Sequence, residues 1–329
     1  MVVGASREYR CATTVLAQCR YSRCLSSKLD SDLSMAKRLF LTFANAGYRN
    51  ALQRLVREAE DSAFFDEICP CAEKDLGSDY IQKYGSWIEA HKRGYGYWIW
   101  KSYLIKTYLD KLNFGDFLIY MDSGCEINKK ARNRYSEYLK LAAESSLGLV
   151  CFSTMSTERK FDKGDVLDAL NMRDNAKALN SAQIMGGMMV ICKKKSSVAL
   201  VKKWFEFVHS HLSLIDDSPS VSPNPEGFIE NRHDQSVVSL LIKKTGGAVV
   251  LKGVDEVEIW PMTNRNWSRL SHTPFHAVRR NKSASRLGNG APFSGLMNGI
   301  WRIENVLIDG YVACRVGLGA WRRKLMGKR

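Results

Sequence analysis

Short apolar runs alternate along this chain with longer segments whose apolar residues recur at helical spacing, and this alternation limits its fold more than any other feature. Leu39–Phe43 and Phe117–Met121 are runs of the kind found in strands that are buried on both faces. Between them, Tyr48, Leu52 and Leu55 recur as on one face of a helix. Strands that alternate with helices predict an α/β fold with a mixed, mainly parallel central sheet covered by helices on both faces.

The same criteria predict the other elements and the limits of the domain. A loop rich in Ser, Pro, Asn and Asp spans residues 213–232, and loops of that length inside a compact domain are usually functional or mobile. We expect an N-terminal appendage over 1–34, one domain over 35–310 and a basic tail over 311–329. Further strands are expected at 64–68, 147–153, 186–192 and 247–251, and further helices at 80–91, 98–112, 131–145, 196–210 and 234–244.

Composition excludes several classes of protein. Of the 329 residues, 45% are hydrophobic and 25% are charged, which argues against a disordered or fibrous chain. The nine cysteines lack the paired spacing of a zinc site, and we interpret them as reduced, buried thiols of a cytoplasmic protein. No apolar run approaches the roughly 20 residues that span a bilayer, and no apolar signal segment is evident near the N-terminus.

The formal net charge of +15 favours an anionic partner but does not choose among nucleic acid, an anionic membrane and a phosphorylated substrate. Part of the excess lies in the basic tail, where Leu318, Trp321 and Leu325 would share one face of a short helix between cations. Such a segment can bind weakly to an anionic membrane surface, which would place the protein at the periphery of a membrane. The alternative is a disordered tail, which Gly319 and Gly327 favour.

The segment Tyr120–Asn128 carries the central chemical signal, because a buried strand ends there at Asp122. In parallel α/β sheets, ligands collect at the carboxyl ends of the strands. A carboxylate at that point can hold a divalent cation that neutralises a diphosphate. Gly124 leaves room for a phosphate or sugar to approach the main chain, and Ser123 would border the same ligand. The alternative for Asp122 is a turn or helix-cap aspartate.

Three other segments carry candidate groups. In Arg93–Lys101, the rings of Tyr97 and Trp98 offer flat faces to a base or sugar, and Lys101 can meet phosphate. The alternative for the tryptophans, Trp98 and Trp100, is a role as core anchors at a helix start.

In Asn231–Ser236, the long loop enters a helix, so Asp234 is either a functional carboxylate or the N-cap of that helix. The segment His272–His276 is followed by Lys282 and can supply a metal ligand and a cation that pairs with phosphate. A solvated basic loop is the alternative there.

Together, these segments resemble a group of small GT-A glycosyltransferases of bacterial polysaccharide loci and large algal viruses, which are distantly similar to glycogenin-like families. The resemblance covers about three quarters of the chain, from Leu39 to about Lys282. Four segments carry it in the family's order: Leu39–Tyr48, Gly94–Lys101, Asp122–Cys125 and Arg232–Ser236. It implies a single Rossmann-like GT-A domain that transfers a sugar from a nucleotide-sugar, UDP-linked, to a glycan acceptor in polysaccharide biosynthesis.

The resemblance also implies a divalent cation, Mn²⁺ or Mg²⁺, at an Asp-x-Asp-type site. Asp122 and the late His276 would be its ligands. The sequence departs from the family pattern at Gly124, which stands where a second aspartate is usual, and Glu126 is a candidate substitute.

Further site roles follow from the resemblance. Asp234 would lie near the anomeric carbon, where it orients the sugar or acts as general base, and Gln183 would be a second catalytic residue. Donor binding is expected from Thr42, Phe43, Ala44, Tyr97, Trp98, Lys101, Ser123, Gly124, Gly186, Gly187 and Lys282, and acceptor or sugar binding from Glu158, Lys163, Asp165, His233 and Gln235.

Two other classes of protein fit parts of the sequence. A nucleotidyltransferase also binds nucleotides at a parallel sheet, but it would normally have a Gly-rich phosphate loop after the first strand, and Ala44–Gly47 is a poor one. A nucleic-acid-binding protein would account for the net charge, yet no known nucleic-acid-binding motif is evident and the basic residues are dispersed or terminal. We therefore expect a glycosyltransferase without a nucleic-acid partner.

Overall fold

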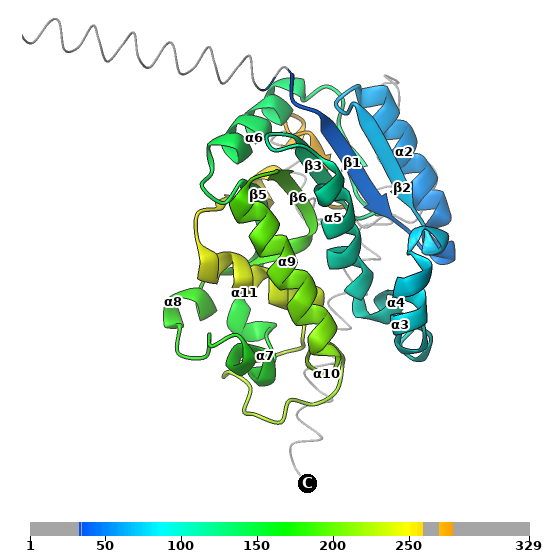
Figure 1. Cartoon of the computed structure of the whole chain (residues 1–329). Helices are drawn as coiled ribbons and strands as arrows, with labels where there is room; N and C mark the ends of the chain where they lie inside the picture. Colours follow the sequence, from blue (N-terminus) through cyan, green and yellow to red (C-terminus); the bar gives the residue numbers. More distant parts are fainter. Residues whose placement is uncertain (1–32, 34, 259–269, 279–329) are drawn as a thin grey trace, which may run out of the picture.

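A computed structural model describes residues 33, 35–258 and 270–278 and centres on a six-stranded sheet with the order β2-β1-β3-β6-β5-β7 (Figure 1). Five of the strands run in one direction, and β6 runs antiparallel between β3 and β5. The predicted mixed, mainly parallel sheet is therefore confirmed. The strands are β1 (Arg38–Phe43), β2 (Glu67–Cys71), β3 (Phe117–Met121), β5 (Leu149–Thr157), β6 (Ala182–Cys192) and β7 (Val249–Lys252).

Helices cover both faces of the sheet because successive strand residues are apolar on both sides. Leu39 and Leu41 of β1 belong to the core beneath one layer of helices, whereas Phe40 belongs to the core beneath the other layer. The first layer contains α3 (Ser78–Ala90), α5 (Ile99–Lys111), α9 (Lys195–Ser210) and α11 (Asp234–Thr245), and the second contains α2 (Arg49–Ser62) and α6 (Arg132–Glu144). Figure 1 shows α5 and α9 crossing the sheet side by side.

Short elements complete the fold at the site end of the sheet. A two-stranded antiparallel ladder joins β4 (Glu126–Ile127) to β8 (Phe275–His276). The short helices are α4 (Gly94–Tyr97), α7 (Gly164–Ala169), α8 (Ala176–Leu179), α10 (Leu212–Ile215) and α12 (Gly253–Glu256). The predictions on Lys282 and on the basic tail over 311–329 lie outside the described residues, as does the predicted appendage over 1–34 apart from residue 33.

The second strand was predicted three residues too early. The apolar run that begins at Phe64 belongs to the connection between α2 and β2, where the Phe64 ring stacks on Tyr135 with centroids 4.5 Å apart. The strand itself is Glu67–Cys71 and contains Pro70. Because β2 lies at the edge of the sheet, a residue without an N–H group is tolerated there.

Two coarse expectations from composition can be compared with the structure. The five cysteines within the described ranges are all free thiols, and four of them are buried. Burial raises the pKa of Cys151 to about 12, so this thiol stays protonated and unreactive at neutral pH. Within the same ranges, no helix combines the length and apolar character that crossing a membrane requires.

An aromatic cluster between α3 and α9 encloses His209. The imidazole accepts a hydrogen bond from the Tyr80 hydroxyl at 3.0 Å through Nε2, while Nδ1 lies 2.7 Å from the carbonyl of Phe205. Because a carbonyl can only accept, Nδ1 carries a hydrogen, and the lowered pKa of the ring leaves Nε2 without one at neutral pH. Burial lowers the pKa of His209 to about 4.

This neutral histidine makes the fold acid-sensitive. The unfolded chain binds a proton at an ordinary histidine pKa of about 6.5, so the stabilisation is fully present above that pH and is lost as pH falls toward 4. We expect about 3 kcal/mol of the free energy of unfolding to be lost over this window through His209. Urea unfolding at pH 7 and pH 4.5 should show a smaller pH dependence in His209→Phe than in the parent or in the exposed-site control His211→Phe. Equal pH dependence in all three would contradict the prediction.

Candidate functional site

The candidate site is built around Asp122, which follows β3 at its carboxyl end. The main-chain N–H of Asp122 donates to the carbonyl of Gly187 at 2.9 Å, and the Tyr120 hydroxyl donates to Asp122 Oδ1 at 2.6 Å. A Cβ atom at Gly187 would lie 2.5 Å from Asp122 Oδ2, so only glycine lets the carboxylate rest against β6. The structure thus brings together two segments that the sequence had predicted for donor binding.

Lys101 connects Asp122 to Asp234. Its Nζ lies 3.3 Å from Asp122 Oδ1 and 3.4 Å from Asp234 Oδ2, and both Lys101 and Asp234 are buried. Burial alone would lower the pKa of Lys101, but the two carboxylates raise it above its ordinary value, so the side chain is a cation. Three residues from distant parts of the chain therefore form one charged cluster.

Asp234 is a perturbed carboxylate rather than a helix cap. It is the first residue of α11, and the residue at the N-cap position is His233. Burial, with help from the nearby charge of Asp122 and against the attraction of Lys101, raises the pKa of Asp234 to about 6. The N-cap alternative is therefore wrong, and the carboxylate has a pKa suited to exchanging a proton near neutral pH.

The start of α5 is set by a left-handed helical turn over Gly94–Trp98. All five residues have positive φ values between 56° and 84°, although three of them are Tyr or Trp. A left-handed conformation costs a non-glycine residue roughly 1–2 kcal/mol, so tertiary contacts must hold the turn. One of them is a hydrogen bond of 3.0 Å from Trp100 Nε1 to the carbonyl of Gly94. The turn leads directly into the helix that carries Lys101.

The predicted aromatic residues divide between core and site. Trp100 is buried against Phe43, with ring centroids 3.9 Å apart, so the core-anchor alternative holds for this tryptophan. Tyr97 and Trp98 face His233, with ring centroids 4.8 and 5.4 Å away. Burial lowers the pKa of His233, which keeps this stacked imidazole neutral at pH 7. Because His233 is the residue that precedes Asp234, this aromatic group lies next to the charged cluster.

The base-binding prediction falls on the end of β1. Thr42 is fully buried, and its hydroxyl oxygen has no hydrogen-bond partner within the described part of the chain. The N–H of Ala44 donates to the carbonyl of Cys71 at 3.1 Å. A buried hydroxyl without a partner is uncommon and is compatible with a ligand contact, and base binding by Thr42, Phe43 and Ala44 stays a prediction.

A chain of amide hydrogen bonds fixes the first turn of α11 against β6. The Gly186 N–H donates to Gln235 Oε1 at 3.0 Å, Gln235 Nε2 donates to Gln183 Oε1 at 2.6 Å, and Gln183 Nε2 donates to Asp162 Oδ1 at 3.0 Å. Burial and the neighbouring carboxyl of Glu158 raise the pKa of Asp162 well above its usual range. With both ends of its amide engaged and no exposed surface, Gln183 holds α11 in place in this geometry.

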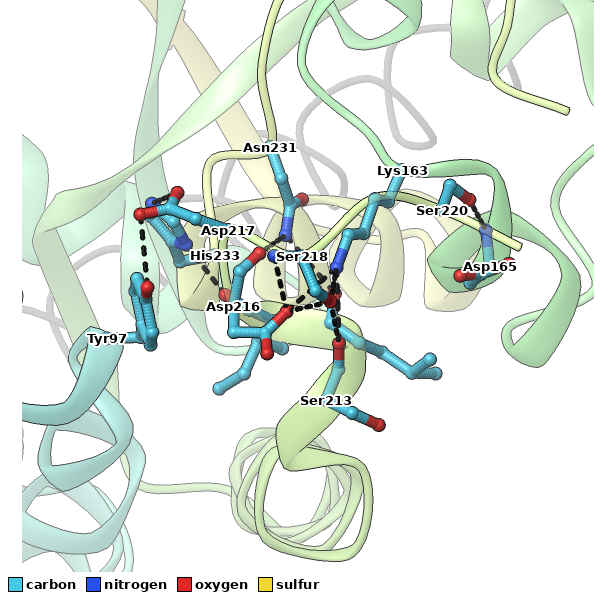
Figure 2. A network of polar contacts seen from close by, with 12 residues as sticks. Tyr97, Lys163, Asp165, Ser213, Asp216, Asp217, Ser218, Ser220, Asn231 and His233 are labelled. Atoms are coloured by element: carbon cyan, nitrogen blue, oxygen red, sulfur yellow. Dashed lines mark hydrogen bonds and ion pairs between the residues drawn. The ribbon is translucent and has the colours of Figure 1, made fainter. Parts of the chain in front are cut away.

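Two of the residues predicted to reach an acceptor, Lys163 and Asp165, fasten the long loop to the domain (Figure 2). Lys163 Nζ lies 3.0 Å from Asp216 Oδ1 and also donates to the carbonyl of Ser213 at 3.1 Å. Asp165 accepts hydrogen bonds from the N–H and hydroxyl of Ser222, both at 2.8 Å. The third predicted residue, Glu158, is buried and pairs with Lys243 at 2.7 Å. Their contact with an acceptor stays a prediction.

Asp217 joins the same loop to the left-handed turn. Its Oδ1 pairs with Arg93 Nη1 at 2.6 Å. Its Oδ2 accepts from the Tyr97 hydroxyl at 3.1 Å, as Figure 2 shows. His233 Nε2 lies 3.6 Å from Oδ1. The loop is therefore attached beside the aromatic residues of the site, where it borders the charged cluster.

The metal prediction rests on Asp122 and His276. His276 is buried in β8 opposite Glu126, with Nε2 2.9 Å from the carbonyl of Leu270. In the described ranges, no group of three or more His, Cys, Asp or Glu side chains could enclose a metal ion. Asp122 alone fits a cation that arrives with a diphosphate, because Mg²⁺ commonly takes one or two carboxylates and fills its other positions with phosphate oxygens and water. His276 as a ligand stays a prediction.

Two charged residues of α2 at the site escaped the sequence analysis. Arg54 and Glu58 lie on the same helical face as the buried Ala51, Leu55 and Ala59. Arg54 is 2% exposed and donates to the carbonyls of the turn that follows Asp122. The sequence did contain a signal for them. A charged pair four residues apart on the apolar face of a helix needs a buried partner.

No protein-family model matches the chain, and no curated protein matches its sequence. One solved structure that resembles it is a glycosyltransferase involved in the glycosylation of the major capsid of PBCV-1. The two sequences are 11% identical, the match covers 73% of this chain and 91% of that chain, and the TM-score is 0.41. Galactosyltransferase LgtC, in complex with donor and acceptor sugar analogs, has 13% identity, with 74% and 85% covered and a TM-score of 0.38. The bifunctional glycosyltransferase WbbM has 11% identity, with 75% and 46% covered and a TM-score of 0.40. All three are glycosyltransferases, and similarity at this level leaves the activity of the present chain to be argued from its own site.

Proposed function

We propose that this protein is a GT-A-type glycosyltransferase that transfers a sugar from a nucleotide-sugar, UDP-linked, to a saccharide acceptor. The observation that carries the proposal is the cluster in which Lys101 bridges Asp122 and Asp234. It lies at the carboxyl end of a central parallel strand, where open α/β sheets bind their ligands. It also combines a cation, a carboxylate that can face a diphosphate and a carboxylate with a pKa of about 6.

Each member of the cluster has a role in this reaction. Asp122 would hold a divalent cation, Mn²⁺ or Mg²⁺, and that cation would neutralise the charge of the diphosphate leaving group. Lys101 keeps Asp122 and Asp234 at a fixed separation and lowers the cost of bringing a diphosphate next to two carboxylates.

Asp234 takes the proton of the acceptor hydroxyl. The oxygen of that hydroxyl forms the glycosidic bond to the anomeric carbon, the bond from that carbon to the diphosphate breaks, and the nucleoside diphosphate leaves with the bonding electrons. At pH 7, a carboxyl group with a pKa of about 6 is mostly ionised and can accept the proton.

The surroundings of the cluster suit a donor and an acceptor. Gly186 and Gly187 leave space on β6 beside Asp122. A side chain at position 186 would crowd Gln235, and one at position 187 would crowd Asp122. Tyr97 and His233 are buried against each other, whereas Trp98 is half-buried beside them and is the ring of this group that we expect a sugar to pack against.

A panel of nucleotide-sugars tests this function. We expect the purified protein to release a nucleoside diphosphate from one donor, with UDP binding strengthened by Mn²⁺ or Mg²⁺. Formation of a nucleoside triphosphate from a nucleotide-sugar and pyrophosphate would instead indicate a nucleotidyltransferase. Binding of duplex DNA that falls steeply with salt, without binding of any nucleoside diphosphate, would contradict the proposal outright.

A further inference from the structure

Two side chains of α2 form hydrogen bonds with the turn that follows Asp122. Arg54 Nη2 donates to the carbonyl of Cys125 at 2.8 Å and to that of Ser123 at 3.2 Å. Its Nη1 pairs with Glu58 Oε1 at 3.0 Å, and Glu58 Oε2 accepts the N–H of Ile127 at 2.9 Å. One ion pair of a single helix therefore contacts three main-chain groups of the segment 123–127.

Because Arg54 is buried, its guanidinium needs these contacts. A guanidinium that is 2% exposed has lost its water and depends on protein acceptors for compensation. Its acceptors include one carboxylate and two main-chain carbonyls, and both carbonyls belong to the turn beside Asp122. Arginine suits this task because its planar fork directs several donors at once, which a lysine ammonium does not do.

The direction of those carbonyls decides where the amides of the turn point. In a planar trans peptide the C=O and the N–H of the next residue point in opposite directions. Since the Ser123 carbonyl is directed at Arg54, the N–H of Gly124 is directed away from α2. Gly124 has no side chain to cover that amide. An N–H group aimed out of a turn beside a strand-end carboxylate is a typical donor to phosphate oxygens.

We propose that Arg54 is a positioning residue for the diphosphate of the donor, which it serves by orienting the turn Ser123–Cys125 and its outward amide. This inference rests on the proposed function, because the diphosphate is the leaving group of that reaction. Arg54 itself does not touch the ligand. Glu58 supports this role of Arg54, because its Oε1 pairs with the guanidinium and its Oε2 accepts the N–H of Ile127.

The test compares binding of UDP with binding of uridine, in the presence of Mg²⁺, by titration calorimetry. In Arg54→Lys, which keeps the charge but loses the fork, we expect UDP to bind about tenfold more weakly and uridine to bind as in the parent. Arg57→Lys is the matched control on the exposed face of the same helix, and both affinities should be unchanged in it.

A second variant covers the case in which Arg54→Lys does not fold. Glu58→Gln keeps an oxygen for Ile127 but weakens the hold on Arg54, and it should reduce UDP affinity by a smaller factor with uridine binding again unaffected. Equal losses for UDP and uridine would mean that Arg54 only maintains the fold, and unchanged UDP binding in folded Arg54→Lys would also overturn the inference. If the parent binds neither UDP nor another nucleoside diphosphate, the proposed function itself fails.

Discussion

Asp122→Ala is expected to lower the rate of sugar transfer by roughly 10²–10³-fold or more, while the protein stays folded. The loss follows from the proposed function, in which Asp122 is the carboxylate that meets the diphosphate, and removing one preorganised electrostatic contact commonly costs that much. The fold should survive because the side chain is 43% exposed and its contacts are the Tyr120 hydroxyl and the Lys101 ammonium. Steady-state kinetics with the donor identified in the panel, together with a thermal melt, would measure both effects.

Asp116 provides the matched control, since it lies at the opposite end of the same strand. Its carboxylate accepts from the N–H groups of Lys37 and Asn113, at 2.9 and 2.8 Å, and it is buried. Asp116→Ala should therefore lower the melting temperature and leave the turnover of the folded enzyme nearly unchanged. Normal turnover in a folded Asp122→Ala variant would remove Asp122 from the proposed mechanism.

For Asp234→Asn we expect kcat to fall by about 10²–10⁴-fold with little change in KM for the donor, as is typical when a general base is removed. The pH profile gives a second readout. The parent rate should rise with pH through an apparent pKa near 6, because the base must lose its proton before it can act, and this acid limb should disappear in the variant.

Asp79→Asn is the control for the charge at a helix start, because Asp79 is the acidic residue in the first turn of α3. It should leave both kcat and the pH profile unchanged. A folded Asp234→Asn enzyme with near-normal kcat would return Asp234 to a structural role, in which it only neutralises Lys101.

The local pattern of apolar residues was sufficient to predict most of the fold. Leu39–Phe43 and Phe117–Met121 are buried on both faces, so uninterrupted apolar runs marked them as inner strands. The same criterion failed at Phe64, where the apolar run packs as a connection and the strand proper carries Pro70. Burial produces the apolar pattern in both cases, and sequence alone does not separate a buried strand from a buried loop.

The sequence indicated candidate site residues one by one but not their arrangement. Asp122 and Asp234 were identified from their places beside a strand and a helix, yet nothing local indicates that Lys101 stands between them. That contact depends on the left-handed turn before α5, and Tyr and Trp carry no preference for such a conformation. For Gln183, the resemblance implied a catalytic role, which stays a prediction, and the sequence could not show that both ends of its amide are engaged within the protein.

The antiparallel course of β6 also sets an order of assembly during synthesis. The unit β2-β1-β3 is complete once residue 121 has left the ribosome, and its parallel pairs need nothing that comes later. Strand β5 is made next but has no neighbour in the sheet until β6 and β7 follow it. When β6 arrives, its first residue pairs with the carboxyl end of β5 and its Met188 pairs with Met121 at the carboxyl end of β3, so the same event that joins the two halves of the sheet also brings Gly187 to Asp122. Such pairing across long stretches of chain is slow, and we therefore expect a nascent chain of this protein to form its candidate site late.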